Sequence, residues 1–390
     1  MTDSYNFSYN STLKNKIKAL LIIINVLTKG ETMNKLTKLL FSVISSVMLV
    51  TSAYAGDFAV TGGVKTTYTI LSNSGTTGTH GVGKGLGISN EFSLSASGEL
   101  DNGMTWSYAQ DIDGATVQDD ANLSFGTDYG TFKICISECG LSTKYAFDNS
   151  AYGVGSDNGY GGGAASTTTM QYGNNISGSN NVQYHAPADL LPLGMTFKVG
   201  TTPGGYGGTA NDSSHSVVGT KSTGDMTQYA VTMAPIDGLT LSGSYYEFDA
   251  MGNQDARQTK EGGSLAFNYS MGPVSFGYGE TKHAPAQRMN NAVATQLVQH
   301  YENEAYSVGF AVNDALSVSY TAESSEKQSR AISNTNVTTR GDVEMDIDTI
   351  DVAYTMGGMT LSLSNSETSN ASYTSGDDVT ETIVAMSLAF

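Results

Sequence analysis

Apolar and polar residues alternate along most of the chain after residue 56. The first such stretch, residues 58–71, places Phe58 and Val60 on even positions and Thr61 and Lys65 on odd ones. A period of two puts successive side chains on opposite faces of a β-strand. Each stretch of this kind therefore predicts a strand with one apolar face and one polar face.

Sixteen such stretches follow one another, and we predict a strand for each. Their ranges are 58–71, 84–101, 103–113, 120–127, 130–137, 180–188, 193–201, 224–234, 238–249, 260–270, 273–281, 303–312, 315–325, 342–355, 358–367 and 378–390. Short turns and longer loops rich in Gly, Ser and Asn alternate between them. This rhythm is typical of outer-membrane barrels, which have short periplasmic turns and long external loops.

The predicted fold is all-β, a 16-stranded antiparallel transmembrane β-barrel. The sheet must close because no strand edge can stay unpaired in lipid. We expect the outward face to be apolar with almost no charge, and the inward face to carry Ser, Thr, Asn, Gln, Lys and Glu around a wet lumen. A soluble β-sandwich is the main alternative, but it buries its apolar faces in a shared core and lacks the short-and-long rhythm.

The amino terminus has the pattern of a signal peptide over residues 33–55. A basic start is followed by an apolar run and by the small-residue cleavage site around Ala53 and Ala55. Residues 1–32 precede this complete signal and are a probable upstream extension. An upstream start codon and an unusually long leader both explain them. The barrel then comprises residues 56–390, exported through the periplasm.

The net charge of the chain excludes one class of partner. The chain has 19 basic and 37 acidic residues, of which six and two precede residue 56, so the remainder has 13 and 35 and a net charge of −22. Such a field repels phosphates, and we expect no nucleic-acid partner. The five histidines have no neighbours that would form a catalytic or metal-binding arrangement. We therefore expect no enzyme activity, no cofactor and no metal.

Three motifs resemble those of the Gram-negative general porins. They are Glu99–Met104, Gly126–Ile134 and Asn180–Pro187, and the chain also ends on Phe390. With the strand rhythm, the resemblance covers most of residues 56–390. It implies an outer-membrane homotrimer whose third external loop folds into the lumen, and a terminal phenylalanine that the barrel-assembly machinery reads. Outer-membrane lipid and lipopolysaccharide are the further expected partners.

The longest connection, residues 138–179, has the position of the constriction loop in that family. It contains Asp148 and Asp157, while the usual loop motif of the family is replaced by Asp157–Gly161. We expect it to narrow the pore, since loops this long are usually functional. A floppy external loop is the alternative.

Strand parity assigns the charged residues of the predicted wall. The residues expected to face the lumen are Lys65, Glu91, Glu99, Lys133 and Lys198. Acids facing bases across a constriction select solutes by charge. We expect passive diffusion of small hydrophilic solutes and ions, with mild cation preference. The alternative is a structural or adhesive outer-membrane barrel with a closed lumen.

Cys135 and Cys139 stand at the start of the long connection. An extended strand would hold them too far apart, but a turn brings them within disulfide distance. In an oxidising periplasm we expect a possible disulfide that fixes the root of the loop. Two free thiols, or half of a metal site, are the alternatives.

Overall fold

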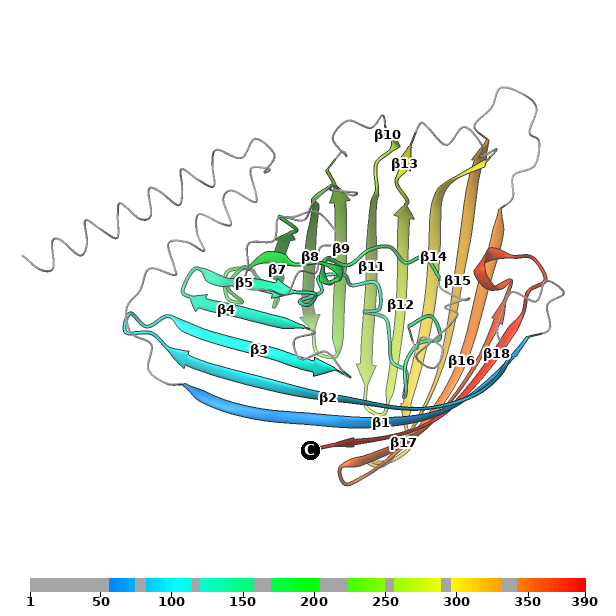
Figure 1. Cartoon of the computed structure of the whole chain (residues 1–390), viewed down its shortest axis with the longest axis horizontal. Coiled ribbons are helices and arrows are strands. Elements are labelled where there is room, and N and C mark those ends of the chain that lie inside the picture. Colours follow the sequence, from blue (N-terminus) through cyan, green and yellow to red (C-terminus); the bar gives the residue numbers. More distant parts are fainter. Residues whose placement is uncertain are drawn as a thin grey trace, which may run out of the picture.

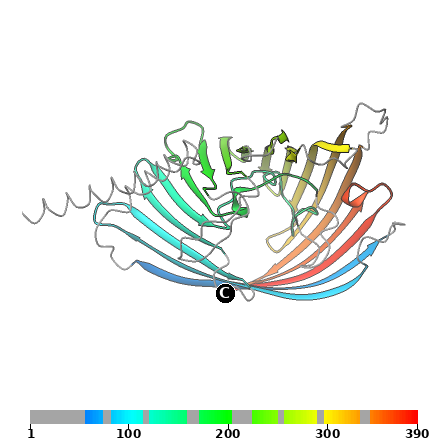
Figure 2. The same ribbon diagram turned by 45° about the horizontal axis from the view of Figure 1, so that its top comes forward.

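The computed structural model describes residues 56–73, 82–113, 120–157, 170–203, 224–249, 256–288, 296–331 and 342–390. Sixteen strands form one closed antiparallel barrel (Figures 1 and 2). Each strand pairs with its neighbours along the chain, and β1 pairs with both β2 and β18. This double pairing closes the sheet.

The barrel strands alternate in direction along the chain. Their bounds are β1 Asp57–Asn73, β2 Gly83–Glu99, β3 Thr105–Asp113, β4 Ala121–Thr127, β5 Gly130–Ile136, β6 Asn181–His185, β7 Thr196–Thr201, β8 Met226–Ile236, β9 Leu239–Phe248, β11 Glu261–Met271, β12 Val274–Ala284, β14 Gln296–Ala311, β15 Leu316–Ala331, β16 Val343–Met356, β17 Met359–Ser369 and β18 Val379–Ala389. Two short strands, β10 Ala256–Gln258 and β13 Gln287–Arg288, form a separate two-stranded sheet. Two 3-10 turns, η2 Ile176–Gly178 and η3 Ala371–Tyr373, complete the elements.

Each of the sixteen predicted strands is present, in the predicted order, so the predicted all-β, 16-stranded antiparallel barrel is confirmed. The short connections are tight turns in which glycine adopts positive φ, as at Gly272 (59°) and Gly357 (61°). None of the described residues belongs to a helix that is long and apolar enough to cross a membrane. The predicted extension 1–32 and signal peptide 33–55, including Ala53 and Ala55, lie outside the described residues.

Two strands extend five residues or more beyond their predicted bounds at one end. β14 begins at Gln296 rather than residue 303, and β15 continues to Ala331 rather than residue 325. The added segments pair with each other through the backbone, from Gln296 opposite Ala331 onward. They contain few apolar residues, so the alternation that predicts a strand fades although the hydrogen-bonded ladder continues.

The outer face is apolar over most of its height. Phe58, Leu86, Ile88 and Leu265 are each at least two-thirds exposed, which fits a surface that meets hydrocarbon. The expectation of almost no outward charge is wrong, because parity and exposure place carboxylates near the long-loop ends of the strands. They are Glu247, Glu261, Glu280, Glu302, Glu304, Glu326, Glu344, Asp346, Asp348 and Glu367.

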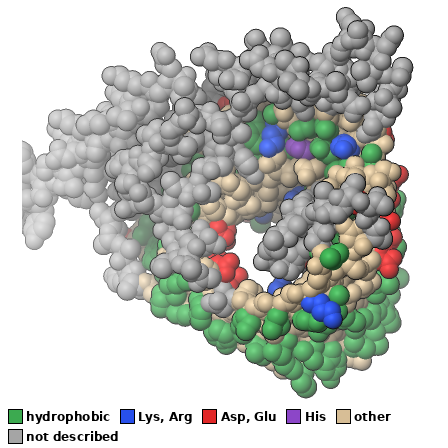
Figure 3. Space-filling model, turned by 45° about the vertical axis from the view of Figure 1, so that its right-hand side comes forward, with side chains coloured by type: hydrophobic (Ala, Val, Ile, Leu, Met, Phe, Trp, Pro, Cys, Tyr) green, Lys and Arg blue, Asp and Glu red, His purple; other side chains and the backbone are tan. Residues whose placement is uncertain are grey.

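These carboxylates lie beside a row of outward tyrosines. Tyr245 donates to Glu261 at 2.9 Å, and Tyr278 donates to Glu304 at 2.8 Å. Figure 3 shows acidic side chains along one edge of the molecule above a broad hydrophobic surface. The strands therefore extend past the apolar band at this end, where charged groups can be solvated.

The inner face is polar over most of its area, as at Ser319, Thr321 and Ser325 on β15. The expectation of a wholly polar inner face is wrong beneath the segment between β5 and β6. There, buried clusters join the segment to apolar side chains of the wall and to Tyr373 of η3. They are Met226, Ala230, Tyr246 and Phe248 with Leu141 and Ile176; Met345, Ile347 and Tyr373 with Met170 and Tyr172; and Ala305 with Phe147 and Val154. Water is excluded from these contacts, so apolar side chains are favourable on this side of the wall.

Candidate functional site

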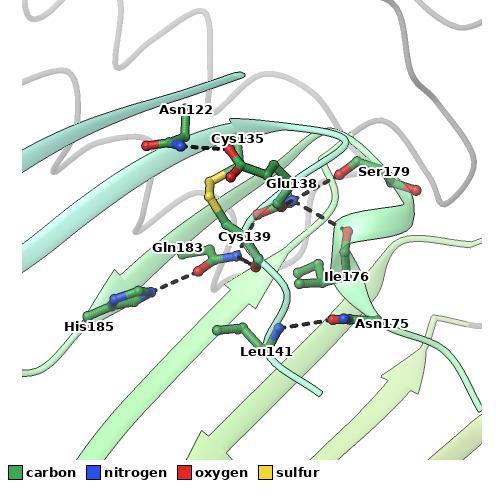
Figure 4. Close-up of a disulfide and its surroundings, with 11 residues drawn as sticks. Asn122, Cys135, Glu138, Cys139, Leu141, Asn175, Ile176, Ser179, Gln183 and His185 are labelled. Carbon is green, nitrogen blue, oxygen red and sulfur yellow. Dashed lines mark hydrogen bonds between the residues drawn. A yellow bond between two sulfur atoms is a disulfide. The ribbon is translucent and has the colours of Figure 1, made fainter. Parts of the chain in front are cut away.

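The segment between β5 and β6 begins with a disulfide. Cys135 and Cys139 are bonded, with their Cα atoms 6.1 Å apart (Figure 4). Ser137 and Cys139 adopt positive φ (51° and 64°), and this turn brings the two cysteines together. Between them, the Glu138 carboxylate accepts a hydrogen bond from Asn122 at 2.6 Å. The first residues of the segment are therefore tied to β4 and β5.

The two limbs of the segment are also tied to each other. The side-chain oxygen of Asn175 accepts from the backbone N–H groups of Leu141 at 2.9 Å and Ser142 at 3.2 Å (Figure 4). Gln183 on β6 donates to the carbonyl of Cys139. The start and the end of the segment are thus bonded to each other and to the barrel at the same place.

Beyond the root, the segment is hydrogen-bonded to inward-facing side chains of successive strands. Backbone N–H groups of Thr143, Asn149 and Ala151 donate to the hydroxyls of Ser244 on β9 (3.0 Å), Ser307 on β14 (2.9 Å) and Ser319 on β15 (2.8 Å). Small hydroxyl residues on the inner face therefore satisfy backbone donors of Thr143, Asn149 and Ala151, which lie in no helix or strand of their own.

Glu323 on β15 holds the far part of the segment. Its buried carboxylate accepts from the backbone N–H of Ser156 at 3.0 Å, from the Ser156 hydroxyl, and from the Tyr172 hydroxyl at 2.8 Å. One wall carboxylate thus joins both limbs of the segment to the barrel.

Glycine lets the segment approach β12 closely. A Cβ on Gly277 would lie 1.8 Å from the carbonyl oxygen of Phe147, and one on Gly279 would lie 2.8 Å from the Phe147 ring. The Phe147 side chain is fully buried in this contact. A side chain at either glycine would push the segment away from β12.

The charged residues of the segment interact with one another. Burial raises the pKa of the Asp157 carboxyl, while the Lys144 ammonium opposes that shift and the Asp148 carboxylate adds to it. Burial likewise lowers the pKa of Lys144, against the attraction of Asp157. The Asp148 carboxylate accepts from the backbone N–H of Ser150 at 2.6 Å. The two predicted loop acids are thus neighbours, and Lys144 is their basic counterpart.

On the opposite wall, the predicted lumen residues fall into two hollows. Lys65 and Glu91, together with Asp113, line a hollow of about 590 Å³ that extends from β2 and β3 across β1 to β18. Glu99 and Lys133 line a second hollow of about 700 Å³ that extends from β1 to β5. The Lys65 ammonium lies 5.2 Å from the centre of the Tyr152 ring in the segment. Figure 3 shows acidic side chains at the edge of an opening in the molecule.

The remaining predicted residues lie apart from these hollows. Lys198 is half-buried on β7, opposite His185 of β6. Phe390 is at the seam, where its backbone exchanges two hydrogen bonds of 2.9 Å with Gly62 and its ring lies 5.7 Å from that of Phe92. The terminal phenylalanine therefore completes the pairing that closes the barrel.

Two important groups were not singled out from the sequence. Glu323 occupies an odd position between the outward residues of β15, so its parity already assigned it to the inner face. Asp113 was treated as the end of a strand, although it is opposite Glu91 on the neighbouring strand. The alternation along a strand assigns a residue to the inner face. It does not show whether that residue contacts the segment or lines one of the hollows.

Within the described ranges, no group of three or more His, Cys, Asp or Glu side chains is close enough to hold a metal ion. The arrangement there consists of a docked segment on one wall and hollows that hold charged side chains on the other.

No protein-family model matches the chain, and no curated protein matches it. Solved structures do match. OmpF of Salmonella typhi, solved with daunomycin, is 13% identical over 87% of this chain and 100% of its own, with a TM-score of 0.55. A porin refined at 1.8 Å is 11% identical over 86% of this chain and 100% of its own, with a TM-score of 0.56. The chain has the fold of the general porins.

Other structures with this fold have diverse descriptions. An anion-selective porin from Comamonas acidovorans is 13% identical over 86% of this chain and 100% of its own, with a TM-score of 0.57. OmpT, an outer-membrane protein of Vibrio cholerae, is 12% identical over 87% of this chain and 99% of its own, with a TM-score of 0.58. At identities this low, the likeness to these structures shows the fold alone, and not the location of the barrel or the solutes that pass.

Proposed function

We propose that this protein is a passive diffusion channel for small hydrophilic solutes and ions. The observation that carries the proposal is the asymmetry of the inner face. The described parts of segment 138–179, residues 138–157 and 170–179, pack against β8, β9, β14 and β16, whereas the two hollows on the other side of the barrel hold charged side chains of β1, β2, β3 and β5. Solutes would pass between the segment and these hollows, with no chemistry and no energy coupling.

The segment acts as the constriction in this proposal. Its root is fixed by the disulfide, and its course is fixed by hydroxyl groups, by Glu323 and by apolar burial. A segment anchored at so many points favours a constant pore width over a floppy external loop. A barrel with a closed lumen, which would serve as a structural or adhesive protein, is the competing function.

The charges along the passage favour cations. Glu91 and Asp113 share one hollow with Lys65, and Asp57 and Glu99 share the other with Lys133. Four carboxylates thus face two ammonium groups along the wall, and a wall with excess negative charge raises the local concentration of cations. We infer a mild preference for cations over anions.

A homotrimer is the proposed assembly. The most exposed apolar side chains of the outer face, Leu86 (79%) and Ile88 (74%), are on β2. The described outward positions of β18, β1 and β2 carry no carboxylates, unlike those of β9 to β17. A face without this charged band suits contact between copies. OmpT of Vibrio cholerae, which shares the fold, is described in a trimer form.

Swelling of proteoliposomes in sugars of increasing size tests the channel directly. The purified protein should admit small sugars and exclude larger ones, at rates proportional to the amount of protein. Vesicles that behave like protein-free controls for every sugar would favour the closed barrel. Swelling without any size limit would contradict a constriction by segment 138–179.

A further inference from the structure

An ammonium group of the barrel wall lies on an aromatic ring of segment 138–179. Lys65 on β1 is exposed, and its Nζ is 5.2 Å from the centre of the Tyr152 ring. At such a distance the negative face of an aromatic ring attracts a cation. Lys65 belongs to the hollow of about 590 Å³, on the side of the barrel that the described parts of the segment leave open. The contact therefore joins the segment to the wall across the proposed passage.

Hydrogen bonds of the backbone fix the position of Tyr152. The N–H group of Ala151 donates to the Ser319 hydroxyl on β15 at 2.8 Å, and this hydroxyl donates to the Asp351 carboxylate on β16 at 3.2 Å. The backbone N–H of Tyr152 bonds to the same carboxylate. The ring is thus held from two strands, whereas Lys65 has a flexible four-carbon stem. Of the two partners, the ammonium is the one that can move away.

Carboxyl groups lie beside the Tyr152 ring. Burial raises the pKa of the Tyr152 hydroxyl, and the carboxylates of Glu381 and Asp351 add to that shift, so both are close enough to act on this side chain. Glu381 on β18 is only 3% exposed, and its Oε1 has no hydrogen-bond partner among the described residues. The Tyr152 side chain itself is only partly buried. A partly exposed aromatic ring with carboxylates beside it attracts ammonium groups.

The hollow offers Lys65 other partners. Glu91 on β2 and Asp113 on β3 line it together with Lys65. Glu91 is opposite Gly63, two positions from Lys65 on the same face of β1, and Asp113 is opposite Glu91. Diagonal neighbours of this kind are within reach of a long side chain. Lys65 can therefore turn from the ring to these carboxylates, and a free cation has only this tethered ammonium to displace.

We propose that Tyr152 is the centre of a binding site for small organic cations with primary or quaternary ammonium groups, and that Lys65 is its resident, displaceable occupant. The cation would lie on the ring, near the carboxylates of Asp351 and Glu381. The proposal rests on the proposed channel function and names a solute class for it. A solute held there would slow the current of smaller ions through the same passage.

Block of single channels by tetramethylammonium tests the proposal, because this ion donates no hydrogen bonds and binds aromatic faces through its charge. It should lower the potassium current of the wild-type channel as its concentration rises. Tyr152→Leu should raise the half-blocking concentration about fivefold, the change expected for one partly exposed cation–π contact. Lys65→Met removes the competing ammonium and should lower the half-blocking concentration about fivefold. Tyr152→Phe retains a ring and should keep most of the block.

Two comparisons separate the ring from general electrostatics. Lys65→Met should not change the block when Tyr152→Leu is also present, because the ammonium then has no ring to vacate. Lys84→Met is the charge-matched control, because Lys84 is exposed on β2 opposite the outward Ile70. It should leave the block unchanged.

Equal block in the wild type, Tyr152→Leu and Lys65→Met would overturn the cation site while leaving the channel intact. An effect of Lys65→Met that persists in the double variant would overturn it as well. Absence of any conductance in the wild type would overturn the channel function instead. Far-ultraviolet circular dichroism and the heat-induced gel shift would show that the variants are folded.

Discussion

An alanine at position 277 should narrow the passage. The added Cβ would lie 1.8 Å from the carbonyl oxygen of Phe147. Carbon and oxygen atoms that are not bonded normally approach no closer than about 3.3 Å, so the segment must move by roughly 1.5 Å. Because β12 is on the wall that carries the segment, the movement is toward the open hollows.

The same movement would weaken nearby anchors. Asn268 donates to the carbonyl of Asp148 at 3.2 Å, and the backbone N–H of Asn149 donates to Ser307 at 2.9 Å. Each such bond contributes about 1 kcal/mol, so the segment would lose about 2 kcal/mol of anchoring. A passage only several ångströms wide would lose tens of per cent of its area.

Single-channel recording in planar bilayers measures the effect. Gly277→Ala should lower the conductance and increase the fluctuations of the open current. Gly85→Ala is the matched control, because a Cβ there meets no atom within 4 Å and the position is on β2, away from the segment. If the Gly277→Ala channel conducts as the wild type and Gly85→Ala channels do, the segment does not border the passage.

Four further outcomes follow from other parts of the structure. Burial in the docked segment raises the pKa of Asp157, so the docked state holds the proton of this carboxyl more tightly than the undocked state. Docking should therefore strengthen as the pH falls through the raised pKa and weaken as the pH rises, so channels should fluctuate less in acid. Asp157→Asn should remove this pH dependence. Replacing both Cys135 and Cys139 by Ser should increase channel flicker but change the free energy of unfolding little, because the bridged residues are only four apart in sequence; a large drop in melting temperature would contradict this. Glu91→Gln should shift the reversal potential in a salt gradient toward anion permeation, and an unchanged potential would remove Glu91 from the passage. Leu86→Lys should convert a trimer to monomers in semi-native gels, and an intact trimer would exclude β2 from the contact.

The sequence predicted the barrel well because the two faces of its wall differ so strongly in polarity. An apolar outer face and a mostly polar inner face impose a period of two, as in residues 58–71, and each short turn has its own sequence signature. The same logic missed the extra lengths of β14 and β15, because strands outside the apolar band need not alternate. It also missed the outward carboxylates, such as Glu304, for the same reason.

The site could be predicted less completely. Parity assigned Lys65 and Glu91 to the inner face, and the spacing of Cys135 and Cys139 raised the possibility of a bridge. Parity alone does not tell a wet inner position from one covered by the segment. The inward Met345 and Ile347 make sense only once Met170 and Tyr172 pack on them. Such contacts join residues more than 170 positions apart, and no local pattern records them.

The central claim is that water fills a continuous path beside the docked segment. The most direct test is the conductance of single wild-type channels in planar bilayers over a range of potassium chloride concentrations. The account predicts discrete, long-lived steps whose size rises with salt, grouped in threes if the trimer is intact. Folded, inserted barrels that produce no steps at any concentration would show that the path is closed.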